Sequence, residues 1–405
     1  MRTAFRQLFT IYPKIRTVVE PTLFLYRYRI LADNDRQMEV FFQEAFRIVP
    51  GLVYGTDEFD AYKRDLMHES FSLGAALPVK IRYIDNDSRP VILLSLHHMI
   101  GDGTSVFHMI TSLLRTLQGE LIPPVPLDRI SIISAQLRKP FIRIPGQIGD
   151  AIRDFSTGLK QAKDYQVIPL VERPAPFFGT SGIHEHTLSH SLADVRAQCR
   201  TLGCTITVFL LSALADALRR QFYRDKGNTV GISLSIDIRP FLGDTPPRIG
   251  NYSGSIMIFC HARYWDLPAQ RLNDIQQQLE RHYRALRDGS RIWNTFLTSV
   301  PNLFGRKIYA RSARMLKRRG LLTLPCALSN LGNLDWLNAV NPQAQLVEFM
   351  PIISHPGLFF FTGSLNDRMQ FYISYPEYEF APADIVSLMR FFEEGLDAIL
   401  HIRGI

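Results

Sequence analysis

The sequence predicts a mixed α/β protein built from two domains. Apolar runs of strand length alternate with segments of helical periodicity in both halves of the chain. Its 405 residues exceed the length at which a single hydrophobic core stops growing. A proline-rich segment separates the two halves. Strands mixed with helices in each half favour α/β sandwich domains.

The first half is predicted to alternate strands and helices. Residues 23–31 alternate apolar and polar side chains, which indicates a half-buried strand, and residues 38–49 place apolar side chains on one helical face. Residues 79–84 and 91–96 are expected to pair as a hairpin. Residues 106–117 form the apolar face of a further helix.

Residues 121–182 are predicted to be the crossover between the halves, because prolines interrupt them repeatedly. The segment is too long for an empty loop, so part of it should pack on the body of the protein. The predicted domains are therefore 1–182, which includes the crossover, and 183–405. In the second half we expect strands at 184–192, 230–238, 358–361 and 369–375, and helices at 208–215, 272–286 and 385–399.

The most informative segment is residues 97–103, His-His-Met-Ile-Gly-Asp-Gly, which lies between a predicted strand and a predicted helix. Side chains that follow one another at a strand end point to opposite faces. We therefore expect one of His97 and His98 to face a cleft and the other to face the protein body. Imidazole can take and return a proton near neutral pH, which is the property of a general base.

The turn after the two histidines is also predicted in detail. Thr104 or Ser105 is expected to cap the following helix. Gly101 and Gly103 are expected to permit a tight backbone path. Asp102 could hold the loop or orient a partner.

Two structural alternatives accompany the catalytic interpretation of this segment. The histidines could be ordinary structural residues before a turn. They could also bind a metal with Asp102, although neighbouring strand histidines are poorly disposed to chelate one ion and no further ligand follows at helical spacing. We expect no metal here. His184, His186 and His190 share one strand face and raise the same alternative, for which a solvated strand face is the preferred interpretation.

Residues 97–103 resemble the His-His-x-x-x-Asp-Gly motif of the CoA-dependent acyltransferase superfamily. This superfamily includes chloramphenicol acetyltransferase, condensation domains of nonribosomal peptide synthetases, plant acyl-CoA-dependent acyltransferases, wax ester synthases and alcohol O-acetyltransferases. Further segments resemble family motifs in family order, namely 203–215, 235–240, 250–254 and 329–332. The resemblance implies two chloramphenicol-acetyltransferase-like mixed α/β sandwich domains with a tunnel between them and the motif at its middle.

The resemblance implies acyl transfer from an acyl-CoA thioester to a hydroxyl group, or to an amine, with His98 as general base. No acyl-enzyme is expected, because the sequence has no Gly-x-Ser-x-Gly nucleophile elbow. No permanently bound cofactor is implied, and acyl-CoA would be a co-substrate. Two alternatives stay open: an acyl-carrier-protein-dependent or condensation-type enzyme of lipid or natural-product biosynthesis, and a non-catalytic binding relative.

The resemblance also assigns supporting residues. Asp102 would be structural and pair with an arginine, for which Arg239 is the candidate, and a surface arginine is the alternative. His97 and Gly103 would be structural, with Gly103 keeping the loop path open. The candidates for oxyanion or substrate contacts are Ser329 and Asn330, for which a plain β-turn is the alternative, and Asn251 and Tyr252 on the acceptor side.

One late segment departs from part of the family. Plant enzymes and condensation domains carry an Asp-Phe-Gly-Trp-type loop, whereas residues 331–336 read Leu-Gly-Asn-Leu-Asp-Trp. This difference favours the bacterial alcohol-acyltransferase branch over peptide-bond formation.

The net charge of +8 is concentrated in residues 306–319. This segment is either a solvated helical face or a surface for an anionic partner: CoA phosphates, an acidic acyl carrier protein or an anionic membrane. No nucleic-acid-binding motif accompanies the charge, so nucleic acid is not expected as a partner.

The sequence predicts a cytoplasmic monomer. Its N-terminus lacks the apolar core of a signal peptide, no continuous apolar stretch is long enough for a transmembrane helix, and the four cysteines show no metal spacing. Residues 5–12 carry an apolar helical face that is expected to pack on the body of the protein. Peripheral membrane contact through this face is the alternative.

Overall fold

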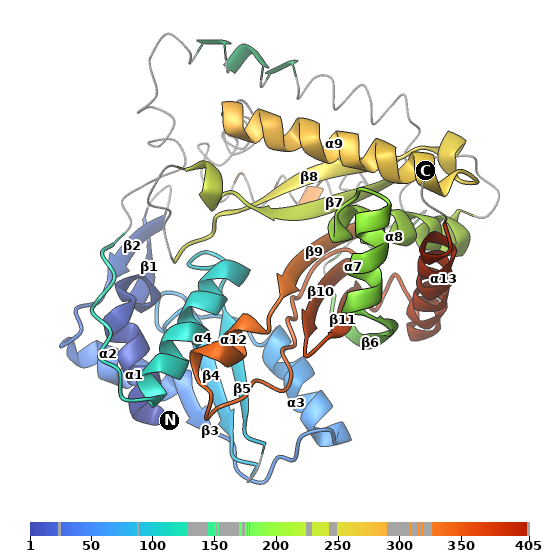
Figure 1. The fold of residues 1–405 in the computed structure, drawn as a ribbon. Coiled ribbons are helices and arrows are strands. Elements are labelled where there is room, and N and C mark those ends of the chain that lie inside the picture. The colour runs from blue at the N-terminus through green and yellow to red at the C-terminus, as the bar shows by residue number, and fades with distance from the viewer. Residues whose placement is uncertain are drawn as a thin grey trace.

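The computed structural model describes residues 1–22, 26–86, 89–127, 179–223, 229–242, 249–289 and 326–402, together with short stretches between 145 and 177 and isolated residues between 308 and 318. Its strands form a two-stranded, a three-stranded and a six-stranded sheet. Figure 1 shows the two smaller sheets on one side of the molecule and the six-stranded sheet on the other.

The N-terminal part is built on the three-stranded sheet, in the order β3-β4-β5. Its elements are α1 (Arg2–Ile11), β1 (Thr17–Pro21), β2 (Tyr26–Ile30), α2 (Arg36–Ala45), β3 (Phe46–Ile48), α3 (Asp57–His68), β4 (Val79–Ile84), β5 (Val91–Leu96) and α4 (Gly103–Leu117). The apolar faces of α1, α2 and α4 meet the sheet in one buried core, which includes Phe9, Phe42, Ile81 and Met109. Removing these side chains from water is the main favourable contribution to this packing.

The predicted hairpin of residues 79–84 and 91–96 is confirmed, with Ile81 opposite Leu94. The predicted helix over 38–49 is wrong at its end. The helix stops at Ala45, and Phe46 begins a short strand parallel to β4. Phe46 is buried in the same core as the apolar face of α2, so the apolar periodicity continued past the true end of the helix.

The C-terminal part is built on the six-stranded sheet, in the order β6-β11-β10-β9-β7-β8. Its strands are β6 (Ser181–Ser191), β7 (Val230–Asp237), β8 (Ser253–Cys260), β9 (Cys326–Asn333), β10 (Phe359–Leu365) and β11 (Arg368–Pro376). The helices of this part are α7 (Leu192–Thr201), α8 (Ile206–Phe222), α9 (Pro268–Asp288), α12 (Trp336–Val340) and α13 (Pro382–Leu400). Figure 1 shows α9 along β7 and β8, and α8 and α13 beside the same sheet.

Helices α7, α8, α9 and α13 bury one face of this sheet in a second core. Helix α8 is buried on nearly all sides, as its uniformly apolar sequence predicts. Helix α9 ends at Gly289, whose φ of +87° is the left-handed conformation that glycine adopts at little cost. Asn366 and Asp367 form the turn that joins β10 to β11, with φ of 52° and 60°.

Most residues of the two cores fall on either side of residue 182, but Ile249 belongs to the N-terminal core, and Leu170 and Val171 pack against the C-terminal one. A C-terminal segment also reaches back across this position. Leu334 and Leu337 pack with Phe107 and Ile110 of α4. The side-chain nitrogen Nδ2 of Asn341 donates to the backbone carbonyl of Leu114 at 3.1 Å. The division into 1–182 and 183–405 remains a prediction.

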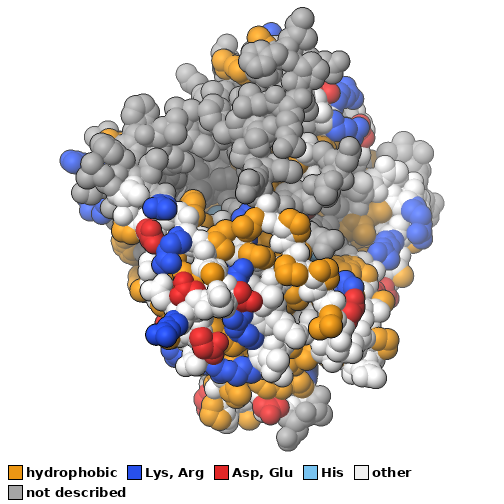
Figure 2. Space-filling view, turned by 90° about the vertical axis from the view of Figure 1, so that its left-hand side faces the viewer, with side chains coloured by type: hydrophobic (Ala, Val, Ile, Leu, Met, Phe, Trp, Pro, Cys, Tyr) orange, Lys and Arg blue, Asp and Glu red, His pale blue; other side chains and the backbone are white. Residues whose placement is uncertain are grey.

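The apolar face of α1 packs on the body of the protein, as expected, because Phe5, Leu8 and Phe9 are all buried. This burial leaves no apolar face of α1 for a membrane. Figure 2 shows the side of the molecule that carries these N-terminal elements, where coloured Lys and Arg side chains are interspersed with Asp and Glu. Several of these charges are paired, as in Arg6 with Asp33 at 2.7 Å.

No single helix in the described part of the chain is long and apolar enough to cross a bilayer. Helices α7 and α8 satisfy the length and composition criteria only as a pair, which is bent by 97°.

Two of the three histidines of β6 contact carboxylates of α13. His186 contacts Glu393 at 2.9 Å, and His190 contacts Asp397 at 2.6 Å. The preferred expectation of a merely solvated strand face is therefore wrong, since helix α13 covers that face. Among the described residues, no group of three or more His, Cys, Asp or Glu side chains is arranged to hold a metal ion.

Candidate active site

The motif lies where the N-terminal part meets the six-stranded sheet. Strand β5 ends at Leu96, a turn follows, and α4 begins at Gly103. The backbone N–H of His97 donates to the carbonyl of Pro78 at 2.9 Å, which extends the strand contact by one residue. The histidines are thus attached to a paired strand on one side and to a helix N-terminus on the other.

The two histidines occupy different environments. His97 is half-buried, its ring lies edge-on to Phe71 at 5.5 Å, and its Nδ1 accepts the N–H of Met99 at 3.2 Å. Burial, and then the neighbouring His98, lower the pKa of His97. His98 is exposed. The imidazole that is free to meet a ligand is therefore that of His98, while His97 braces the turn in its neutral form.

Asp102 caps helix α4. Its Oδ1 accepts the backbone N–H of Ser105 at 3.0 Å, which satisfies one of the unpaired amides at the helix start. The prediction that Thr104 or Ser105 provides the cap is wrong by two or three positions. The carboxylate is favoured here because a helix N-terminus carries partial positive charge.

Asp102 forms a two-pronged ion pair with Arg239, which follows the end of β7. Arg239 Nη1 donates to Oδ2 and Nη2 donates to Oδ1, both at 2.9 Å. The side chains are only 5% and 4% exposed. Burial alone would raise the pKa of Asp102, but Arg239 and the amides of Ser105 and Tyr252 together hold this pKa below its ordinary value. Asp102 is therefore a buried carboxylate that stays ionised.

Ser105 connects the partners of this ion pair. It is fully buried, its hydroxyl lies 2.9 Å from Asp102 Oδ1, and it accepts from Arg239 Nη2 at 3.1 Å. The hydroxyl also contacts both the carbonyl and the N–H of Gly250, at 3.0 and 3.1 Å. We call Asp102, Ser105, Arg239 and the backbone of Gly250 the clamp, because they join α4 to the chain around β7 and β8.

A second link joins the motif helix to β7. The hydroxyl of Thr104 donates to Asp237 Oδ2 at 3.0 Å, and Asp237 Oδ1 accepts from Arg239 Nη1 at 3.1 Å. Ser105 and Asp237 are site residues that the sequence did not predict. Asp237 lies within the family-like segment 235–240 and could have been identified from it. Ser105 shows no signal beyond its place at the helix start.

Of the two residues expected on the acceptor side, Tyr252 is buried and Asn251 is exposed. The ring of Tyr252 is buried, and it packs against Arg239 at 4.9 Å and Lys14 at 5.5 Å. The backbone N–H of Tyr252 donates to Asp102 Oδ2 at 2.8 Å. Tyr252 therefore supports the clamp. Asn251 is exposed, and its side-chain oxygen accepts the hydroxyl of Ser253 at 2.7 Å.

Ser329 and Asn330 lie within strand β9 and not in a β-turn. The side-chain nitrogen of Asn330 donates to Thr207 of α8 at 3.1 Å, so Asn330 faces the helix-covered side of the sheet. Ser329 projects from the opposite side by strand alternation and is half-buried. Two residues on, Leu331 lies beside Gly103, with its Cδ2 3.6 Å from the position of a Cβ there. Ser329 is thus on the motif side of the sheet, and Asn330 is not.

Gly103 was expected to keep the loop open, but the glycine that the packing requires is Gly101. A Cβ at Gly101 would lie 2.4 Å from Leu96 Cδ2 and 3.0 Å from Ser105 Cβ. At Gly103, the first residue of α4, a Cβ would meet only Leu331 at an ordinary 3.6 Å.

We expect Gly101→Ala to destabilise the protein by about 1–3 kcal/mol through overpacking. Gly103→Ala should leave stability unchanged or raise it, because alanine favours a helix over glycine by up to about 1 kcal/mol. Urea unfolding of both variants measures the difference. Equal stability of the two variants would contradict this account.

The chain is similar to several solved structures at 11–16% sequence identity. No protein-family model matches it, and no curated protein is significantly similar in sequence. The first condensation domain of the CDA synthetase superposes with a TM-score of 0.69 at 11% identity, over 100% of this chain and 88% of that one. A wax ester synthase/diacylglycerol acyltransferase from Marinobacter aquaeolei VT8 has a TM-score of 0.57 at 16% identity, over 98% and 88% of the two chains.

The epimerization domain from the third module of tyrocidine synthetase B is similar as well, with a TM-score of 0.60 at 14% identity, over 98% of this chain and 88% of that one. All three superpose on nearly the whole of this chain. The predicted fold class, mixed α/β with two lobes, is therefore confirmed. At these identities the similarity shows the fold alone.

Proposed function

We propose that this protein transfers an acyl group from a thioester, with acyl-CoA as donor, to a hydroxyl acceptor, and that His98 is the general base. The observation that carries the proposal is the exposed imidazole of His98 beside the buried Asp102–Arg239 clamp. The clamp holds the turn in place, and the imidazole of His98 takes no part in its hydrogen bonds. A fixed, accessible base is what proton abstraction from a bound hydroxyl requires.

The proposed reaction needs one base and no covalent enzyme intermediate. Neutral His98 removes the acceptor proton as the acceptor oxygen attacks the thioester carbon. The resulting tetrahedral oxyanion collapses, the C–S bond breaks, and the protonated imidazole returns its proton to the departing thiolate. Donors directed at the oxyanion lower this barrier. The hydroxyl of Ser329, on the motif side of β9, is our candidate donor.

His97 has a structural role in this proposal. Its Nδ1 accepts a backbone N–H, so its neutral form carries the proton on Nε2, and the lowered pKa favours that form. The ring contact with Phe71 then holds the turn from which His98 projects.

The direct test is thiol release from a panel of short to long acyl-CoA donors, with alcohol and amine acceptors. Acceptor-dependent thiol release that disappears in His98→Ala supports the proposal. His190→Ala is the matched control, since it removes a histidine outside the motif, on strand β6, whose ring contacts Asp397 of α13. Equal activity of native protein and His98→Ala would refute the role of His98.

A carrier-protein donor is a second candidate, and the observation behind it is a group of exposed basic side chains. Most of the basic segment 306–319 lies outside the described residues, but Arg311, Arg314 and Arg318 are described and exposed. A basic surface of this kind would suit an acidic acyl carrier protein.

We expect reversal of these three charges to glutamate to weaken turnover with an acyl carrier protein about tenfold or more, and to preserve turnover with free acyl-CoA. Rim charges act mainly on association, so the loss should shrink as salt is added. Equal loss with both donors would argue against a docking role.

A further inference from the structure

The face of the six-stranded sheet that is turned toward the motif carries a row of aromatic side chains. Residues paired across neighbouring strands project from the same face. Phe361 is paired with Ser329, and Phe359 with Ala327. Since Leu331 follows Ser329 on this face and lies beside Gly103, this face is the one turned toward the motif. Phe360, on the opposite face, is fully buried in the helix-covered core.

This aromatic row is continuous. The rings of Phe361 and Phe359 lie 4.6 Å apart, and the rings of Phe359 and His355 lie 5.0 Å apart. Phe361 stays half-buried although β10 is an inner strand of the sheet, so the surface above it is not completely packed. We call His355, Phe359 and Phe361 the aromatic row.

One end of the aromatic row points to the motif. Gly363 follows Phe361 on the same face, and a Cβ there would lie 3.6 Å from Leu331 Cβ. Leu331 in turn lies against Gly103. Contacts therefore run from the start of α4 through Leu331 and Gly363 to Phe361 without a charged side chain among them.

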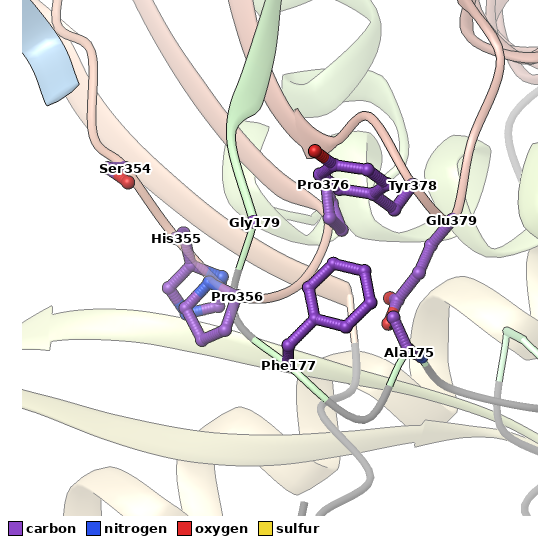
Figure 3. Close-up of a pocket in the computed structure, with 9 residues that line it drawn as sticks. All are labelled: Ala175, Phe177, Gly179, Ser354, His355, Pro356, Pro376, Tyr378 and Glu379. Carbon is purple, nitrogen blue, oxygen red and sulfur yellow. Dashed lines mark hydrogen bonds between the residues drawn. The ribbon is translucent and has the colours of Figure 1, made fainter.

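The other end of the aromatic row opens into a pocket of about 200 Å³, in which His355 is a lining residue. Figure 3 shows His355 and Pro356 on one side of this pocket, Tyr378 and Glu379 on the other, and Phe177 of the crossover between them in this view. The rings of Phe177 and Tyr378 lie edge-on at 4.9 Å.

Two contacts define the walls of this pocket. The backbone N–H of Ala175 donates to Glu379 Oε1 at 2.9 Å, which holds the crossover at the rim. Nδ1 of His355 accepts the N–H of Gly357 at 3.1 Å. Burial lowers the pKa of His355, so its ring is neutral and compatible with an apolar ligand.

We propose that the aromatic row is the wall along which an apolar chain of the substrate lies, and that the pocket in Figure 3 receives the far end of this chain. The inference rests on the proposed function, because it assigns the reacting end of the chain to His98. From Gly363 to Phe359 the strand rises about 13 Å, at 3.3 Å per residue. An extended chain of roughly ten carbons spans this distance at C–C bonds of about 1.5 Å.

An apolar chain could belong to the acyl donor or to an alkyl acceptor, and kinetics distinguish the two. Phe361→Ala removes the end of the aromatic row that lies nearest the motif. If the acyl donor carries the chain, we expect this variant to lower kcat/KM for a dodecanoyl donor about tenfold relative to an acetyl donor. If the acceptor carries the chain, we expect the same loss for dodecanol relative to ethanol. Phe391→Ala is the matched control, since it removes a half-buried ring of α13 outside this face and should change neither ratio.

A labelling experiment on the unaltered protein needs no turnover. Dodecyl-CoA thioether and dodecanol, each with a diazirine at the far end of the chain, are photolysed with the protein, and the labelled peptides are mapped. We expect label in 354–361 or 375–379 from one of the two probes, with competition by the unlabelled compound. Label elsewhere, or none from either probe, overturns the inference. Correct labelling without thiol release in the donor panel would leave the chain site standing and refute the proposed reaction.

Discussion

Replacing His98 with alanine is expected to lower acyl-transfer turnover by about 10²–10⁴-fold, which is the usual contribution of a positioned general base. The fold should survive, because the His98 side chain is exposed and the clamp does not include it. Thiol release under saturating donor and acceptor measures the loss. An unchanged melting temperature in the same preparation separates loss of the base from unfolding.

The substitution His98→Gln sharpens this test. Glutamine keeps a hydrogen-bonding side chain but has no base of suitable pKa, so it should lose turnover as alanine does. If glutamine restored most of the rate, His98 would bind or orient the acceptor and would not remove its proton.

Arg239→Met is expected to destabilise the protein by about 3–5 kcal/mol, which is typical when one partner of a buried ion pair is removed. The cost comes from the carboxylate of Asp102, which stays buried with only its backbone and Ser105 contacts. Urea unfolding at neutral pH measures the change. Arg29→Met is the control: Arg29 pairs with Glu20 at 2.7 Å, both side chains are 40% exposed, and such pairs contribute about 0–1 kcal/mol.

In this variant, the contribution of Asp102 to the free energy of unfolding should change with pH in the opposite direction from its contribution in the native protein. In the native protein the pKa of Asp102 is lowered, so its contribution to stability is complete above its unfolded-state pKa of about 4 and is lost as the pH falls through the folded value. Without Arg239, burial should raise this pKa above the unfolded value. The destabilisation by Arg239→Met should then shrink on acidification, and a constant difference between pH 7 and pH 4 would contradict the account.

The double variant Asp102→Asn/Arg239→Met isolates the buried charge. It removes both charges, so it should be more stable than Arg239→Met alone at neutral pH. If the double variant were less stable than the single one, the cost would arise from lost packing around Tyr252 and not from the uncompensated carboxylate.

The sequence by itself determined the mixed α/β class, most of the elements and the position of the motif. The hairpin of residues 79–84 and 91–96, the buried helix α8 and the glycine end of α9 follow from periodicity and local backbone preference. These signals are local, because each depends on residues within a few turns or a few strand positions of one another.

Only the tertiary structure decided which distant residues share a face. Ser329 and Asn330 are neighbours in the sequence, but strand alternation sends them to opposite sides of β9, and the strand replaced an expected turn. The buried Ser105 joins the clamp, and Thr104 bonds to the half-buried Asp237, because α4 meets the end of β7 more than 130 residues later. The aromatic row depends on the register of β9 against β10, which no local pattern encodes. Contacts between remote segments are set by packing and register, and these form only when the sheets assemble.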